Sequence, residues 1–303
     1  MAYIGFRDLF KEATTNVLDD FYYTEGGGTT PTDYPMANAQ TRRLGSVYRR
    51  TTGGFVDLTF HSKNALVAGD EHLVPNLVGV LGHNLTVGDQ LSITVTYRVN
   101  PGTTVLKTIP ISAANTDKFN NTFFPIRERL SDIPWKVQIR FVRAAPISAY
   151  IDVGRIWMGP LWDVGNPTLT TQENLIQERW KLSMSSGAKS DISIGNQSYT
   201  NGAKSFKNLD FKMIFTNDGD FIGDGTKGLN QTNSGLAFIN ELENGGECIV
   251  VPREFDATQS PSARDSLWAT RVGIYGESGK SAHSINQISA LQYELALKIK
   301  ELQ

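Results

Sequence analysis

Alternation of apolar and polar residues with a period of two dominates the chain between residues 54 and 160. The apolar positions that follow it are Val56, Leu58, Phe60, Leu91, Ile93, Val95, Val137, Ile139 and Phe141. Such alternation is typical of strands that bury one face. Residues 77–81 are a short apolar run that suits a strand buried on both faces, and residues 151–158 predict another strand, bent near Gly154. Gly, Pro and Asn turns separate these segments, so the pattern predicts an all-β fold, with a sandwich or jelly roll over residues 41–163.

The 303 residues exceed the usual size of a single hydrophobic core, so further parts are expected. Residues 1–40 are polar and rich in turn-forming residues, which predicts an N-terminal arm or loop. After a linker-like break around residues 160–171, residues 171–282 are predicted to form a second β-rich domain. Its predicted strands are residues 209–215, 247–251 and 267–275. Residues 232–243 fit a helix that ends at the stop signal Asn-Gly-Gly.

The last segment, residues 283–303, is predicted to be an amphipathic helix. Its apolar residues recur at spacings of three, four, four and three, and they are Ile288, Leu291, Leu295, Ile299 and Leu302. Such a face can pack on its own chain or on a neighbouring subunit, or it can oligomerise through a helical bundle. These five residues are therefore the candidates for an interface.

The composition of the chain limits the classes of binding partner and the cellular compartment that we expect for it. A formal net charge of -2 gives no electrostatic footprint for nucleic acid, and no apolar run is long enough for a membrane span. Cys248 is the single cysteine, which excludes an intrachain disulfide and a cysteine-rich zinc site. The first residues lack the pattern of a signal peptide, so we expect synthesis and folding in a cytoplasm.

Three segments carry a resemblance to a known group of proteins. Residues 77–91 contain Val-Gly-Val-Leu-Gly-His-Asn-Leu, residues 135–141 read Trp-Lys-Val-Gln-Ile-Arg-Phe, and residues 150–162 contain Ile-Asp-Val-Gly-Arg-Ile-Trp-Met-Gly-Pro. In this order they resemble tailed-bacteriophage structural proteins with a galactose-binding-like (discoidin-type) jelly roll. The resemblance spans residues 42–162, about two fifths of the chain. It implies a jelly roll followed by a second β-module, and a place in the tail or tail tip of the virion.

The matching residues also have roles that follow from physical chemistry. Asn84 can hydrogen-bond within its own turn. Arg155 follows a glycine at the predicted bend and is expected to pair with Asp152 or to cap a neighbouring strand. Trp157 and Trp162 are expected to anchor the two modules to each other.

The chain offers little that resembles catalytic or cofactor chemistry. It has no nucleophile elbow, P-loop or dinucleotide fingerprint, so we expect no enzyme and no cofactor. His83 lies in a turn and is interpreted as a polar group that satisfies the fold. The spacing after Asp218 fails the EF-hand pattern, which leaves a looser calcium site at Asp218, Asp220 and Asp224 as the alternative to an exposed acidic turn.

These observations favour a bacteriophage virion structural protein, in the tail, tail tip or baseplate, that assembles with other virion proteins as a homo-oligomer and takes part in host attachment. The alternative is a carbohydrate-binding module that recognises a host surface glycan, with Tyr22, Tyr23 and Tyr34 as aromatic platforms. A third class is a hydrolase of envelope polysaccharide, which sequence does not exclude because catalytic carboxylates meet only in the fold.

Overall fold

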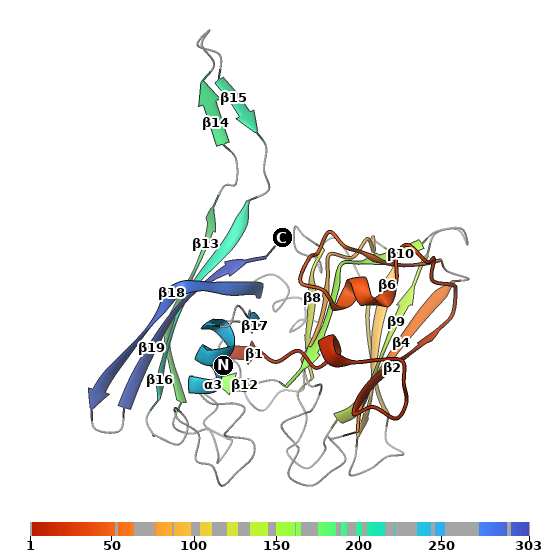
Figure 1. The fold of residues 1–303 in the computed structure, drawn as a ribbon, viewed down its shortest axis with the longest axis horizontal. Coiled ribbons are helices and arrows are strands. Elements are labelled where there is room, and N and C mark those ends of the chain that lie inside the picture. Colours follow the sequence, from red (N-terminus) through yellow and green to blue (C-terminus); the bar gives the residue numbers. More distant parts are fainter. Residues whose placement is uncertain are drawn as a thin grey trace.

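The computed structural model shows an all-β protein with two β-lobes, and the described residues include the short α-helix α3 (Gly235–Glu243) (Figure 1). It describes residues 2–51, 54–63, 75, 77–86, 88–97, 104–110, 120–126, 134–144, 150–160, 162–164, 175–185, 189–192, 198–201, 205–215, 221, 235–243, 246–251, 273–289 and 292–302. We call the lobe that contains the five-stranded sheet the sandwich lobe, and the lobe built on the seven-stranded sheet the sheet lobe.

The sandwich lobe has a five-stranded antiparallel sheet in the order β2-β4-β9-β6-β7. Its strands are β2 (Phe21–Gly26), β4 (Phe55–Ser62), β6 (Gln90–Tyr97), β7 (Thr104–Pro110) and β9 (Pro134–Val142). The opposing layer contains a three-stranded sheet in the order β11-β5-β8 and the pair β10-β3. These strands are β3 (Tyr48–Thr51), β5 (Leu77–Leu81), β8 (Thr122–Pro125), β10 (Tyr150–Val153) and β11 (Arg155–Gly159). The 3-10 helices η1 (Phe10–Glu12) and η2 (Met36–Gln40) pack beside them.

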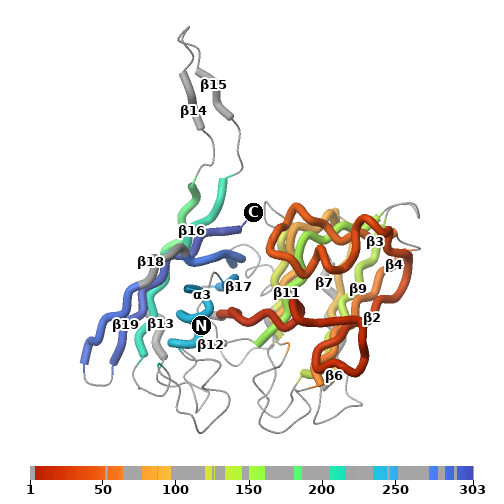
Figure 2. The backbone as a smooth tube through the Cα atoms, viewed as in Figure 1, coloured from red at the N-terminus to blue at the C-terminus, as the bar shows by residue number. Residues whose placement is uncertain are grey.

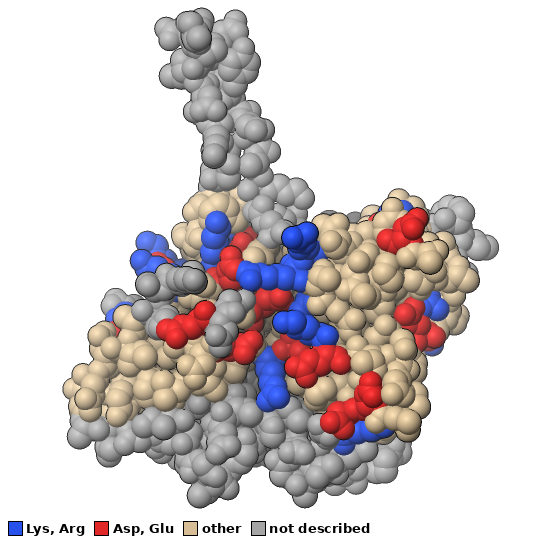
Figure 3. All heavy atoms as spheres, in the orientation of Figure 1, with Lys and Arg blue, Asp and Glu red and all other residues tan. Residues whose placement is uncertain are grey.

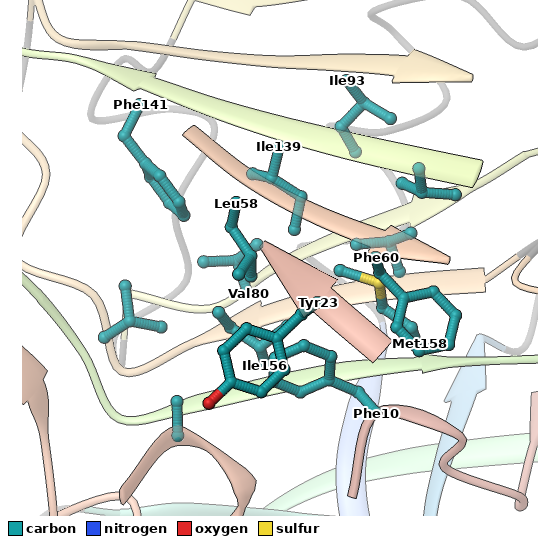
Figure 4. Close-up of a cluster of buried hydrophobic side chains, with 14 of the residues drawn as sticks. Phe10, Tyr23, Leu58, Phe60, Val80, Ile93, Ile139, Phe141, Ile156 and Met158 are labelled. Atoms are coloured by element: carbon teal, nitrogen blue, oxygen red, sulfur yellow. The ribbon is translucent and has the colours of Figure 1, made fainter. Parts of the chain in front are cut away.

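One hydrophobic core lies between the two layers of this lobe (Figure 4). Leu58, Phe60 and Ile139 reach it from the five-stranded sheet, and Val80 and Ile156 reach it from the opposite layer. The alternation that predicted half-buried strands is therefore confirmed, as is the run at residues 77–81, all of which are buried. The sandwich is established; its membership of the galactose-binding-like jelly rolls stays a prediction.

The sheet lobe is a single antiparallel sheet in the order β12-β1-β17-β18-β19-β16-β13. Its strands are β1 (Ala2–Gly5), β12 (Trp162–Val164), β13 (Leu175–Ser185), β16 (Phe206–Phe215), β17 (Glu247–Val251), β18 (Ile274–Ser289) and β19 (Gln292–Glu301). The helix α3 (Gly235–Glu243) packs against β17 and β18 and contributes Phe238, Ile239 and Leu242 to the core of this lobe. The helix expected over residues 232–243 is thus confirmed from Gly235 to Glu243, and residues 232–234 lie outside the described residues.

The first forty residues are built into both lobes and do not form the predicted arm. β1 pairs with β17 and β12 in the sheet lobe, whereas β2 pairs with β4 in the sandwich lobe. The N-terminal segment between them crosses from one lobe to the other (Figure 2). The prediction was wrong because this turn-rich stretch contains two short strands, β1 and β2, which pair with strands from other parts of the sequence.

The C-terminal helix predicted over residues 283–303 was also wrong, because this segment is a β-hairpin of β18 and β19. In β19 the buried residues are Leu295, Leu297, Ile299 and Glu301, which follow a period of two. β19 pairs with β16 along eight positions from Asn208 to Phe215. Pairing on both sides and burial of one face override the helical preference of the individual residues.

A second hairpin extends the sheet lobe outward. β13 and β16 pair up to Ser185 and Phe206, and the chain continues into β14 (Lys189–Ile192) and β15 (Ser198–Asn201), which pair with each other. The ribbon of β14 and β15 stands out beyond the rest of the molecule (Figure 1).

Candidate functional site

The two lobes meet through a shared apolar cluster. Leu77, Leu81, Phe123 and Trp157 come from the sandwich lobe, and Ile249, Val251 and Tyr275 come from the sheet lobe. All seven are fully buried. The expectation that Trp157 anchors the two modules is therefore confirmed; the side chain of Trp162 lies outside the described part.

Two glycines allow the N-terminal segment to approach β11 closely. A Cβ on Gly5 would lie 2.4 Å from Cη2 of Trp157, and a Cβ on Gly159 would lie 1.9 Å from the carbonyl oxygen of Arg7. Neither distance is sterically possible, so any larger residue would push the segment away. The junction is therefore packed as tightly as a domain core.

A buried polar cluster lies beside these apolar residues. The guanidinium of Arg155 donates through Nη2 to Asp8 Oδ2 at 2.5 Å and to Glu247 Oε2 at 3.1 Å. The Tyr275 hydroxyl donates to the same Glu247 oxygen. The side chains of Arg155, Asp8 and Glu247 are 1%, 7% and 11% exposed. We call Arg155, Asp8, Glu247 and Tyr275 the junction cluster. It joins four parts of the chain, which are β11, β17, β18 and the segment that follows β1.

The junction cluster has one cation for two carboxylates. Burial raises the pKa of Asp8 to about 6; Arg155 and the backbone N–H groups of Met158 and Phe10 oppose this rise, and the charge of Glu247 adds to it. Burial and the charge of Glu247 also raise the pKa of Tyr275, which keeps it a hydrogen-bond donor. Because the excess negative charge is buried, Asp8 can take up a proton in mildly acidic solution.

Arg155 thus binds partners that the sequence interpretation did not name. Its expected partner Asp152 instead accepts from Arg49 Nε at 2.7 Å and Nη2 at 2.9 Å. Asp8 and Arg155 are separated by 147 positions, and no local spacing signals such a pair. At the surface, Arg42 and Glu277 form another ion pair between the lobes, and charged side chains gather along the line where the lobes meet (Figure 3).

The turn around His83 has the structural role that was predicted for it. His83 is 2% exposed, and its Nε2 lies 2.9 Å from the hydroxyl of Thr122. Burial lowers its pKa to about 4, so the imidazole is neutral at pH 7. Asn84 accepts from the Asp152 N–H and donates to the Tyr150 carbonyl, which joins this turn to β10.

The three tyrosines proposed as glycan platforms do not lie on one surface. Tyr23 is in the core of the sandwich lobe, with its ring 5.7 Å from Phe10, and is closed to a ligand. Tyr22 stacks on His61 at 4.2 Å. Tyr34 lies under the guanidinium of Arg49, which also covers the ring of Tyr150.

The residues predicted to form an interface differ in their burial within the hairpin of β18 and β19. Leu295 and Ile299 are buried in the core of the sheet lobe, and Leu302 packs against the apolar cluster of the junction. Ile288 is 51% exposed on β18. Leu291 lies outside the described residues. Of the set, Ile288 alone among the described residues is available to a partner.

Asp218, Asp220 and Asp224, the candidates for a calcium site, lie outside the described residues. Within the described ranges, no group of three or more His, Cys, Asp or Glu side chains is arranged to hold a metal ion. No helix among the residues that the structure describes is long and apolar enough to cross a membrane.

No protein-family model matches the chain, and no curated protein matches its sequence. One solved structure with detectable similarity is the glycoside hydrolase domain of Endo-D from Streptococcus pneumoniae R6. The alignment has 9% sequence identity and a TM-score of 0.28, and it covers 65% of this chain and 34% of that chain. This chain therefore spans about a third of the length of that structure. A TM-score of this size does not indicate a shared fold, so no property of the hydrolase is transferred to this protein.

Proposed function

We propose that this protein is a structural component of a bacteriophage particle, placed in the tail, tail tip or baseplate, that acts by protein–protein assembly and contributes to host attachment. The observation that carries this proposal is the interlocked junction of the two lobes. The N-terminal strand belongs to the sheet lobe, and the chain then crosses to complete the sandwich lobe.

Domains in one chain move relative to each other by default unless their interface is large and hydrophobic. Here an apolar cluster and a buried ionic cluster fill the junction, and both contain residues from each lobe. The two lobes therefore behave as one stiff body. Stiffness suits a subunit that transmits position through an assembly, because copies in a symmetric array must keep the same shape.

The hairpin that ends in β14 and β15 also supports an assembly role. Its strands are paired with each other and lie beyond the edge of both lobes (Figure 1). A projecting ribbon of this kind can reach a neighbouring subunit, and repeated copies gain avidity from individually weak contacts. The resemblance of residues 42–162 to tailed-bacteriophage structural proteins gives the particle in which we place this subunit.

Purified particles test the proposal. Phage particles from a lysate of the strain that carries this gene should contain the chain as a stoichiometric component by mass spectrometry. Gold-labelled antibodies against the recombinant chain should then mark the tail. A chain that is abundant in the lysate but absent from purified particles would refute the proposal. Labelling confined to the head would refute the tail assignment alone.

A further inference from the structure

The loop between η1 and β2 presents two apolar side chains to solvent. Residues 14–20 read Thr-Thr-Asn-Val-Leu-Asp-Asp, and we call them the tip loop. Val17 is 54% exposed and Leu18 is 81% exposed, the highest value among the large apolar side chains described. These two residues are the centre of a β-turn, because the N–H of Asp19 donates to the carbonyl of Asn16 at 3.1 Å. The loop can be followed in Figure 1 on the sandwich lobe.

The chemistry of turns does not account for an apolar pair at this position. Glycine, proline, asparagine, aspartate and serine are the usual residues of turns, because each favours the turn backbone by its own mechanism. Val17 and Leu18 offer no such mechanism. A single exposed leucine is common on protein surfaces, but here two adjacent apolar residues lie where polar residues would serve the turn better. Their side chains therefore indicate a contact with an apolar surface outside the loop.

Polar side chains within the tip loop fix the shape of its turn. The carboxylate of Asp19 accepts from the Thr14 hydroxyl at 2.5 Å and from Asn16 Nδ2 at 2.9 Å. The side-chain oxygen of Asn16 in turn accepts from the N–H of Leu18 at 3.1 Å. Hydrogen bonds of this kind are typical of Asx turns. The polar residues of the loop thus hold the backbone that carries the two apolar side chains.

Backbone hydrogen bonds attach both ends of the tip loop to the five-stranded sheet. The Thr14 N–H donates to the carbonyl of Phe21, and the Thr14 carbonyl accepts from the N–H of Tyr23. Both aromatic residues are buried in the core of the sandwich lobe. At the other end, the Asp20 carbonyl accepts from the N–H of Lys63 at 2.9 Å. Because the loop is ordered before it meets a partner, binding costs little conformational entropy.

Acidic residues around the apolar pair indicate the charge of the partner. Residues 11–20 contain three acidic residues and one lysine, and Glu12 and Asp20 are exposed. Lys63, beside the loop, places its ammonium group over the ring of Tyr22, 5.4 Å from the centroid. Acidic groups are in excess even when Lys63 is counted. The complementary surface is therefore apolar at its centre and basic at its rim, and an anionic lipid surface would be repelled.

We propose that the tip loop inserts Val17 and Leu18 into an apolar pocket with a basic rim on a neighbouring protein of the virion. An apolar anchor in a pocket, surrounded by complementary polar groups, is the arrangement that supplies most of the affinity in protein interfaces. This inference rests on the proposed function and names one contact through which the subunit assembles. A contact of this size is weak in one copy, and repeated copies in the particle would add avidity.

Competition for incorporation into particles tests the apolar contact. Native and variant chains are produced together in equal amounts during infection, and their ratio in purified particles is measured by mass spectrometry. Leu18→Asn should be under-represented about tenfold or more, because it removes the apolar anchor without adding a charge. The matched control is T15N, which introduces the same residue at another exposed position of the same loop and should be incorporated like the native chain.

A second pair of variants tests the charge of the rim. D20K reverses the charge of an exposed residue beside the apolar pair and should be under-represented about threefold or more. Its control, D33K, makes the same change at an exposed residue outside the loop and should be incorporated like the native chain. All four variants alter exposed positions, so their melting temperatures should equal that of the native chain.

Hydroxyl-radical footprinting of the native chain gives a readout that needs no variant. Val17 and Leu18 should be oxidised in the free chain and protected in the particle. Equal incorporation of L18N and native chains, or equal oxidation in both states, would overturn the inference. Binding of the free native chain, but not of L18N, to phosphatidylglycerol vesicles would also overturn it and assign the loop to a lipid surface. These failures with the native chain present in particles leave the proposed function intact, whereas absence of the native chain from particles would overturn the proposed function itself.

Discussion

Replacing Asp8 by asparagine tests the charge balance of the junction cluster, because it removes one titrating carboxyl group and keeps the size of the side chain. The asparagine Oδ1 can still accept from the backbone N–H groups of Phe10 at 3.0 Å and Met158 at 3.1 Å, but the side chain no longer titrates. In the native chain, burial raises the pKa of Asp8 from 3.8 to about 6. A raised carboxyl pKa contributes stability that is complete below pH 3.8 and is lost as the pH rises through 6.

The magnitude follows from the interval between the two pKa values. Between them, each pH unit changes the free energy of unfolding by about 1.4 kcal/mol, and little changes above pH 6. From pH 8 to pH 5, the native chain should therefore gain about 1.4 kcal/mol over D8N. Contributions from carboxylates elsewhere are common to both proteins and cancel in the difference.

Urea unfolding at pH 5, 6, 7 and 8 measures this difference, with equal m-values as the check that both proteins unfold in the same way. A difference that does not change with pH would show that the pKa of Asp8 is not raised in the folded protein. A difference that favours the native chain more strongly at pH 8 than at pH 5 would show that pairing with Arg155 lowers that pKa. Either result would refute the conclusion that the pKa of Asp8 in the junction cluster is raised.

Three substitutions test the rest of the packing. Replacing Arg155 by methionine leaves two buried carboxylates without their shared cation and should lower the free energy of unfolding at pH 7 by about 3–5 kcal/mol; a loss below about 1 kcal/mol in urea would contradict this. Gly159→Ala places a methyl group 1.9 Å from a carbonyl oxygen and should lower the melting temperature and expose the N-terminal segment to proteases; an unchanged digestion pattern would argue against the close approach. Leu297→Ala should cost about 2–5 kcal/mol and Lys298→Ala less than about 0.5 kcal/mol; equal costs would mean that the last strand is misassigned.

The strands of the sandwich lobe could be predicted because each of them carries its own signal. Val56, Leu58 and Phe60 alternate with polar neighbours, and their side chains are buried while Phe55 at the strand end is exposed. The bend at Gly154 was also predicted from its glycine, and in the structure β10 ends at Val153 and β11 begins at Arg155. In both cases the information lies within a few consecutive residues, where side-chain size and polarity decide the local geometry.

The C-terminal hairpin shows where a periodic pattern supports two interpretations. Leu295 and Ile299 lie four positions apart, which fits one face of a helix and also one face of a strand. Leu297 separates the two, because it would point away from the helical stripe but is buried beside the other two in β19. What decides the outcome is pairing with β16 and β18, and those partners are not encoded in the spacing of the segment itself.

The junction cluster could not be predicted from the sequence for a related reason. Asp8, Arg155, Glu247 and Tyr275 come from four segments, and each segment by itself looks like an ordinary strand end or turn. They meet because β1 inserts beside β17, which places the following residues against β11. A polar cluster of this kind stabilises one arrangement of the lobes over others, since any shift would leave a buried charge without its partner.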